Sequence, residues 1–199
     1  MIQKFLIIVS VLLGISAAGL AQNAPRMEIF GGFSFAKAGF SSTNSPFFLS
    51  AVPFGQNFDL RGWEASVSEN VDSWFGVTQE FTGLYGNPRL NGFNHNTHLY
   101  SFLSGPRFSY RHNERITPFA HALFGYDEIS MKIPAAGGIA AKDQSYGMAL
   151  GGGLDVKLHG VFALRLIQAD YYMTQFFGKT QSNLRLSAGI VIQLGRTGY

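Results

Sequence analysis

The sequence predicts an all-β protein, specifically an eight-stranded antiparallel up-and-down transmembrane β-barrel. Apolar and polar residues alternate with period 2 through eight segments, as in strands with two chemically different faces. Charged residues make up only 14% of the chain, whereas aromatic residues reach 15% and Gly is abundant. After the N-terminal segment, no apolar run of about 18 residues follows, so the pattern favours membrane-spanning strands over a spanning helix.

Residues 1–21 have the pattern of a secretory signal peptide. Lys4 supplies a positive charge, residues 5–15 form an apolar run, and Gly19 and Ala21 stand at positions −3 and −1 of a cleavage site. This run is too short to span a membrane. We therefore expect cleavage after Ala21 and one barrel domain over residues 22–199. The chain has no Cys, which excludes disulfides, thiolate metal sites and a lipoprotein anchor.

The first four predicted strands are separated by turn signals. They are expected at residues 27–36, 59–68, 74–84 and 97–110. A stretch rich in Ser, Asn, Gly and Pro separates the first two, and Asn-Pro and Asn-Gly turns lie between the third and fourth. Pro106 cannot donate a backbone hydrogen bond, so we expect a β-bulge at Gly105-Pro106 in the fourth strand.

The last four predicted strands alternate as clearly, except for the fifth. They are expected at residues 117–126, 145–157, 161–172 and 183–194. In the fifth strand we expect His121 to point inward. In the sixth, three consecutive Gly residues, 151–153, would let the wall curve and leave space in the lumen. In the seventh, Arg165 and Asp170 have odd spacing, so either a bulge intervenes or Asp170 lies at the rim.

The connections alternate between long and short along the chain. Long connections follow the first, third, fifth and seventh strands, and short ones follow the second, fourth and sixth. Outer-membrane barrels have this asymmetry, with long extracellular loops and tight periplasmic turns. The small and polar face of the strands suits a narrow lumen, and the aromatic face suits interfacial girdles. We therefore expect the apolar face to meet lipid.

The chain resembles the small stand-alone members of the OmpA-like transmembrane β-barrel family over essentially its whole mature length. The resemblance rests on the leader and on four segments, Glu28-Ile29-Phe30-Gly31-Gly32-Phe33-Ser34-Phe35, Gly105-Pro106-Arg107, Gly151-Gly152-Gly153-Leu154-Asp155 and Leu184-Arg185-Leu186-Ser187-Ala188-Gly189. It implies a non-enzymatic protein with an envelope-structural or surface-interaction role. It also implies that paired charges plug the lumen, and the candidate residues are Glu64, Glu80, Arg107, Asp155, Arg165 and Arg185.

Two features depart from the family pattern. No peptidoglycan-binding domain is expected after the barrel, so cell-wall tethering is not implied. Family members end the last strand on an aromatic residue that the barrel-assembly machinery reads, whereas here the strand is expected to end at Leu194, with Tyr199 five positions on. The other expected partners are outer-membrane lipid and a surface ligand bound by the long loops, residues 37–58 and 127–144.

Enzymatic, metal and nucleic-acid functions find no support in the sequence. Eight-stranded lipid A deacylases would show a His-x-Ser spacing, but His98 and Ser101 are three apart and lie on opposite faces of a strand. His95 and His98 lack a third metal ligand. Basic residues are scattered singly, so nucleic acid is not expected as a partner. We expect no enzyme activity, no cofactor and no metal.

Two alternatives stay open at the level of sequence. One is a porin-like channel for small solutes, which would need a lumen that the charged side chains leave open. The other is a soluble secreted lipocalin-like binding barrel, with a faint entry motif at Gly62-Trp63. This second alternative requires the aromatic face to lie inside the barrel.

Overall fold

The computed structural model describes residues 24–39, 57–87, 89–90, 93–94, 96–113, 115–133, 139–176 and 179–196. The predicted signal peptide, residues 1–21, lies outside these ranges, as do Tyr199 and most of the first predicted long loop. None of the described residues belongs to a helix of the length and apolarity that a membrane crossing requires.

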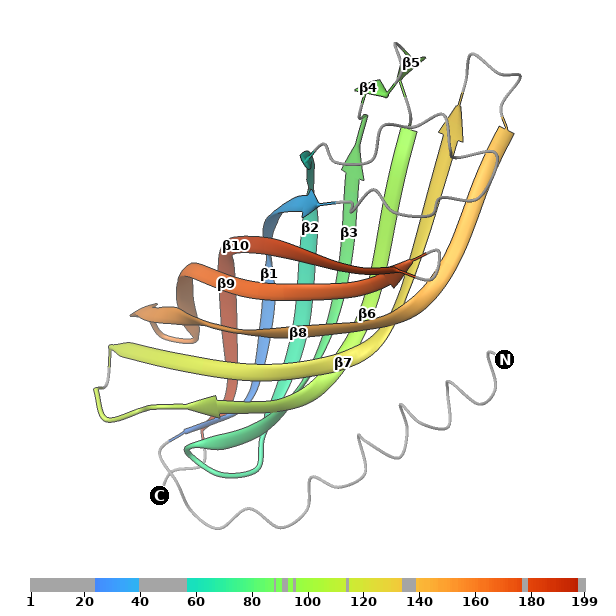
Figure 1. Ribbon diagram of the computed structural model, residues 1–199. Coiled ribbons are helices and arrows are strands. Elements are labelled where there is room, and N and C mark those ends of the chain that lie inside the picture. Colours follow the sequence, from blue (N-terminus) through green and yellow to red (C-terminus); the bar gives the residue numbers. More distant parts are fainter. Residues whose placement is uncertain are drawn as a thin grey trace.

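Eight long strands form a closed antiparallel barrel in which each strand pairs with its neighbours in sequence (Figure 1). The barrel strands are β1 (Pro25–Gly39), β2 (Asn57–Asn70), β3 (Phe75–Gly86), β6 (Asn96–Ser109), β7 (Ile116–Ile133), β8 (Ile139–His159), β9 (Phe162–Phe176) and β10 (Lys179–Arg196). Pairing of β1 with β10, from Pro25 opposite Arg196 to Lys37 opposite Leu184, closes the barrel. The predicted fold class is confirmed.

A small hairpin of β4 (Arg89–Leu90) and β5 (Phe93–Asn94) lies between β3 and β6, beyond one end of the barrel (Figure 1). We call this end, where β1, β3, β7 and β9 finish, the loop end. The opposite end, which carries the short connections 71–74, 110–115 and 160–161, is the turn end. Both chain termini of the barrel, Pro25 and Arg196, lie at the turn end.

The strands are longer at the loop end than the sequence predicts. Residues 127–144 were expected to be a loop, but β7 continues to Ile133 and β8 begins at Ile139, and the two strands pair over this whole length. Most of the expected loop at residues 173–182 is likewise strand. Polar residues such as Asp127 extend the strands because a cross-strand partner satisfies the backbone and the polar lumen accepts the side chain.

The bulge predicted at Gly105-Pro106 is wrong. Ser104 pairs with Phe124 and Arg107 with His121, so both strands advance by three residues and neither has an extra one. A bulge lies instead in β9. Leu154 pairs with Ile167 and the next residue, Asp155, pairs with Arg165, which leaves Leu166 as the extra residue.

The bulge at Leu166 resolves the odd spacing of Arg165 and Asp170. Leu166 and Ile167 are both half-exposed on the outer wall, and the extra residue returns the strand to its alternation. Arg165 and Asp170 are therefore both buried inside the barrel. Of the two alternatives that the sequence left, the bulge is correct and the rim position is wrong.

The two faces of the wall differ as predicted. Large apolar side chains from all eight barrel strands are exposed on the outside, for example Phe33, Trp63, Phe124 and Tyr146. The inner face carries mostly small, polar or charged residues. The arrangement required by a soluble lipocalin-like barrel, with the aromatic face inside, is therefore excluded.

The barrel interior is layered along its axis. Nearest the loop end, an apolar cluster fills the lumen with Ala36, Leu60, Leu84, Leu99, Leu103, Leu123, Ile129, Ala149 and Tyr172. Charged and polar residues predominate in the middle and toward the turn end, where a smaller apolar cluster of Phe30, Ala163 and Val191 is also buried. A barrel of eight strands is just wide enough for its own side chains to fill the interior, and this one is filled by two chemically different layers.

Candidate functional site in the barrel lumen

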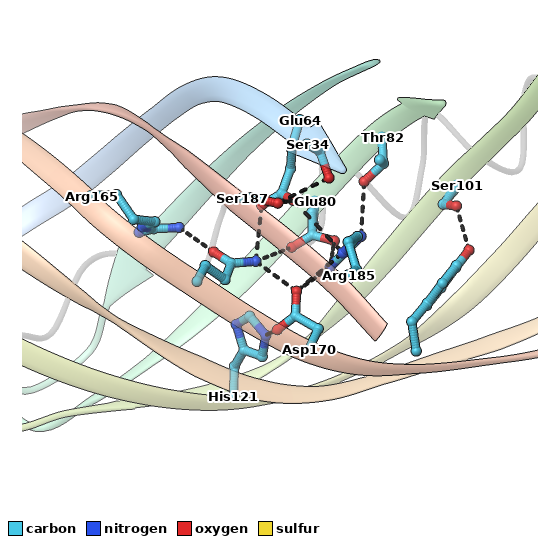
Figure 2. A network of polar contacts seen from close by, with 12 residues as sticks. Ser34, Glu64, Glu80, Thr82, Ser101, His121, Arg165, Asp170, Arg185 and Ser187 are labelled. Carbon is cyan, nitrogen blue, oxygen red and sulfur yellow. Dashed lines mark hydrogen bonds and ion pairs between the residues drawn. The ribbon is translucent and has the colours of Figure 1, made fainter. Parts of the chain in front are cut away.

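One guanidinium in the middle of the lumen gathers carboxylates from three other strands (Figure 2). Arg185 of β10 places its Nη2 2.5 Å from Glu80 Oε1 on β3 and 2.7 Å from Asp170 Oδ2 on β9. Its Nε lies 3.7 Å from Glu64 Oε2 on β2, and its Nη1 donates to Thr82 Oγ1 at 3.0 Å. All the charged members are fully buried, so these contacts cross the barrel interior from wall to wall.

Two further side chains complete this middle cluster. The Gln168 amide nitrogen donates to Glu64 Oε1 and to Asp170 Oδ2, each at 2.9 Å. His121 Nε2 lies 2.7 Å from Asp170 Oδ1, so His121 points inward as predicted. Because a buried charge is costly unless it is paired and hydrogen-bonded, Gln168 and His121 help to satisfy carboxylates that one guanidinium alone would not satisfy.

A second cluster lies at the turn end. Arg107 lies between two acids, with its Nη1 2.8 Å from Glu28 Oε2 and its Nη2 2.9 Å from Asp155 Oδ2. Arg165 donates from Nε to Asp155 Oδ1 at 2.8 Å, and from Nη1 to Gln168 Oε1 at 2.7 Å. Gln168 therefore joins the two clusters. From the rim, Arg111 also reaches Glu28, at 3.0 Å.

Aromatic rings separate and support the turn-end cations. The guanidinium carbons of Arg107 and Arg165 lie 4.1 Å and 4.4 Å from the centroid of the Phe119 ring. On another side, Arg165 lies 4.3 Å from the centroid of Phe30. Such cation–π contacts stabilise guanidinium groups that have lost their water.

A third polar group is embedded in the apolar layer. Tyr172 Oη donates to Asp127 Oδ1 at 2.6 Å and also lies 2.6 Å from Ser101 Oγ. Gly147 makes room for this carboxylate, because a Cβ at that position would lie 1.8 Å from Asp127 Oδ2. Gly151 does the same for Asp170, with a distance of 2.1 Å to Oδ1.

The buried charges of the described residues are predominantly acidic. Six carboxylates, Glu28, Glu64, Glu80, Asp127, Asp155 and Asp170, face three arginines, Arg107, Arg165 and Arg185. Oxygen atoms of Glu64, Glu80 and Asp170 lie within 4.8 Å of one another, a spacing that can hold a metal ion. Here the Arg185 guanidinium already binds these acids. Chemically, the arrangement cross-links strands through the barrel interior.

All six candidate residues of the sequence analysis lie buried in the lumen, but in two separate clusters. Glu64, Glu80 and Arg185 meet in the middle, whereas Arg107, Asp155 and Arg165 meet at the turn end. Five further residues belong to the buried polar contacts of the lumen but were not predicted from the sequence: Glu28, Gln168, Asp170, Asp127 and Tyr172. Glu28 was detectable from its place on the polar face of the first strand. Asp170 needed knowledge of the bulge, and Asp127 was placed in a loop.

The histidines considered for catalysis are not arranged for it. His98 is half-buried on the outer side, with its ring 5.3 Å from that of Tyr85, whereas Ser101 is buried inside. The two lie on opposite faces of β6, as predicted. His95 lies outside the described residues.

No protein-family model matches the chain, and no curated protein matches its sequence. Solved structures do resemble it. Neisserial surface protein A (NspA) is 14% identical, with 87% of this chain and 100% of that chain covered and a TM-score of 0.62. Ail, the attachment invasion locus protein of Yersinia pestis, solved with the heparin analogue sucrose octasulfate, is 18% identical, with 85% and 99% covered and a TM-score of 0.57.

The outer membrane protein OprG from Pseudomonas aeruginosa is 10% identical, with 89% of this chain and 99% of that chain covered and a TM-score of 0.58. At these identities the likeness concerns the fold. The fold that the sequence resemblance implied is thereby confirmed: this chain has the fold of the small eight-stranded outer-membrane β-barrels.

Proposed function

We propose that this chain is an exported, non-enzymatic outer-membrane barrel whose lumen is plugged by its own side chains, with a role in envelope structure or surface interaction. The contacts of Arg185 carry the proposal, because they tie β10 to β2, β3 and β9 across the interior. In the proposed protein these ion pairs stabilise the barrel and block the passage of solutes through the lumen.

The outer wall supports the membrane location. A soluble monomer rarely exposes a continuous apolar surface, whereas a membrane barrel carries an apolar band flanked by aromatic girdles. Here aromatic side chains stand outward near both ends. Trp74, Phe108 and Tyr110 lie toward the turn end, and Tyr85, Tyr100, Tyr126 and Tyr146 lie toward the loop end. This pattern, with the predicted signal peptide, favours insertion by the barrel-assembly machinery.

The last strand ends closer to Tyr199 than the sequence suggested. It was expected to end at Leu194, but β10 continues to Arg196, three residues before Tyr199 in the sequence.

The layered interior favours the plug over the channel alternative. A solute entering from the loop end would meet an apolar layer that includes Leu103 and Leu123, both fully buried. Behind it lie the middle and turn-end charge clusters, which are joined through Gln168. A conducting path would require both layers to open together.

The proposed surface interaction belongs to the loop end. Connections at that end carry binding in rigid barrels because they can vary without disturbing the wall. Ail, whose fold is similar, was solved in complex with the heparin analogue sucrose octasulfate, which supports a surface-interaction role by analogy of fold. Deleting residues 41–56 is expected to leave the barrel folded and to abolish binding to host or neighbouring cells. Unchanged binding would refute a role for this loop.

Two measurements on refolded mature protein test the proposal as a whole. A closed membrane barrel resists SDS until it is heated, so boiled and unboiled samples should migrate differently. Equal migration, with solubility in the absence of detergent, would refute the membrane barrel. In planar bilayers, the plug predicts no steady openings, whereas large steady openings would establish the channel alternative.

A further inference from the structure

The outer wall has an apolar groove in its loop-end half, across β7, β8 and β9. The groove has a volume of about 610 Å³, within the range of pockets that bind small molecules. Its floor is a row of cross-strand partners, Gly125, Gly147 and Thr174. Gly147 and Thr174 are buried and face the lumen, so this row presents its backbone to the outside.

Rows of larger side chains border this floor on both sides. Toward the middle of the barrel, Phe124, Met148 and Met173 are cross-strand partners on the outer face. Toward the loop end stand Tyr126 and Tyr146, whose rings meet edge to face with centroids 6.4 Å apart. The two rows are two residues apart along each strand, about 7 Å between backbone positions, so the groove runs as a narrow slot across the three strands.

A polar and then a basic zone follow the groove toward the loop end. Tyr126 Oη donates to Gln144 Oε1 at 2.6 Å, and Gln144 Nε2 donates to Glu128 Oε2 at 2.8 Å. One step further, Lys142 is 65% exposed, with its Nζ 3.8 Å from Glu128 Oε1. Lys132, on the adjacent strand, is also exposed. Two ammonium groups thus accompany one carboxylate on this part of the outer wall.

We propose that the groove and the basic zone together bind one anionic, phosphate-bearing lipid of the leaflet at the loop end, with a hydrocarbon chain in the groove and a phosphate beside Lys142 and Lys132. The order of chemistry along the wall matches such a lipid: an apolar slot, then hydroxyl and amide groups, then cations. Tyr146 and Lys142 are four residues apart, about 13 Å along the strand, so one lipid can reach both zones. The site rests on the proposed membrane location, because the groove is continuous with the lipid-facing surface.

Native mass spectrometry of the refolded barrel tests the site, with dimyristoyl phosphatidylglycerol as the anionic probe and dimyristoyl phosphatidylcholine as its zwitterionic control. The wild-type barrel is expected to retain one phosphatidylglycerol about fivefold more tightly than phosphatidylcholine, the effect of about one cation near a phosphate. Met148→Trp fills the groove and should lose both lipids. Lys142→Gln should bind both lipids equally.

Matched variants separate the site from a general effect on the wall. Leu150→Trp adds the same indole on the outer face of β8 outside the groove, and Lys37→Gln removes an exposed cation from β1 at the same end. Both should bind lipid as the wild type does. Equal retention by Met148→Trp and Leu150→Trp would overturn the groove, and a wild type without preference for phosphatidylglycerol would overturn the phosphate site. If the lipid site fails but the wild type still shows a heat-dependent gel shift, the proposed lipid site is wrong and the proposed membrane barrel is not.

Discussion

Replacing Arg185 with Met is the sharpest test of the lumen network. The substitution keeps a side chain of similar length but removes the guanidinium that contacts Glu80 at 2.5 Å and Asp170 at 2.7 Å. Asp170 keeps His121 and Gln168 as partners, whereas among the described residues Glu80 keeps a 3.4 Å contact from the Gln168 amide nitrogen. Removing one partner of a buried ion pair costs about 3–5 kcal/mol, and we expect a loss of this size.

Urea unfolding of the barrel in lipid vesicles, followed by the unboiled gel band, measures this loss. With a denaturant dependence of about 2 kcal/mol per molar urea, the midpoint should fall by roughly 1.5–2.5 M. Because Glu80 depends most on the guanidinium, Arg185→Met combined with Glu80→Gln should recover at least about 1 kcal/mol. Arg61→Met, an exposed arginine on the outer face of β2, should change stability by less than about 0.5 kcal/mol.

A single outcome would refute this reasoning. If Arg185→Met and Arg61→Met unfold at the same urea concentration as the wild type, the buried contacts of Arg185 contribute nothing net to the barrel. The lumen would then be held by its walls alone, and the charged residues would have to be explained by another role.

The remaining predictions concern the polar group in the apolar layer. Gly147→Ala would place a Cβ 1.8 Å from Asp127 Oδ2 and should destabilise the barrel by about 1–3 kcal/mol in the same assay, whereas Gly31→Ala, which meets open space, should be nearly neutral. Tyr172→Phe removes a hydroxyl that donates to Asp127 at 2.6 Å and should cost about 1–3 kcal/mol. Tyr171→Phe, which alters only an exposed hydroxyl, is its control, and equal losses from both would contradict the prediction.

The sequence alone determined that there are eight barrel strands, roughly where the central part of each lies, and which way most of their side chains point. In a closed narrow barrel, each strand residue points either to the lumen or to the lipid, so alternation with period 2 decides the face directly. That is why the inward positions of Arg185, Glu80 and His121 could be predicted. The same alternation, together with the low charge content, predicted that the outer face is apolar.

Only the tertiary structure decided which charges meet. Arg107 and Asp155, for example, are 48 residues apart in the sequence and become neighbours only when the strands assemble. The extra residue at Leu166 decides that Asp170 points inward, because the odd spacing of Arg165 and Asp170 in the sequence fits a bulge and a rim position equally well. Asp127 joined a strand because β8 offered a partner, so its place in the lumen depended on pairing between strands rather than on local composition.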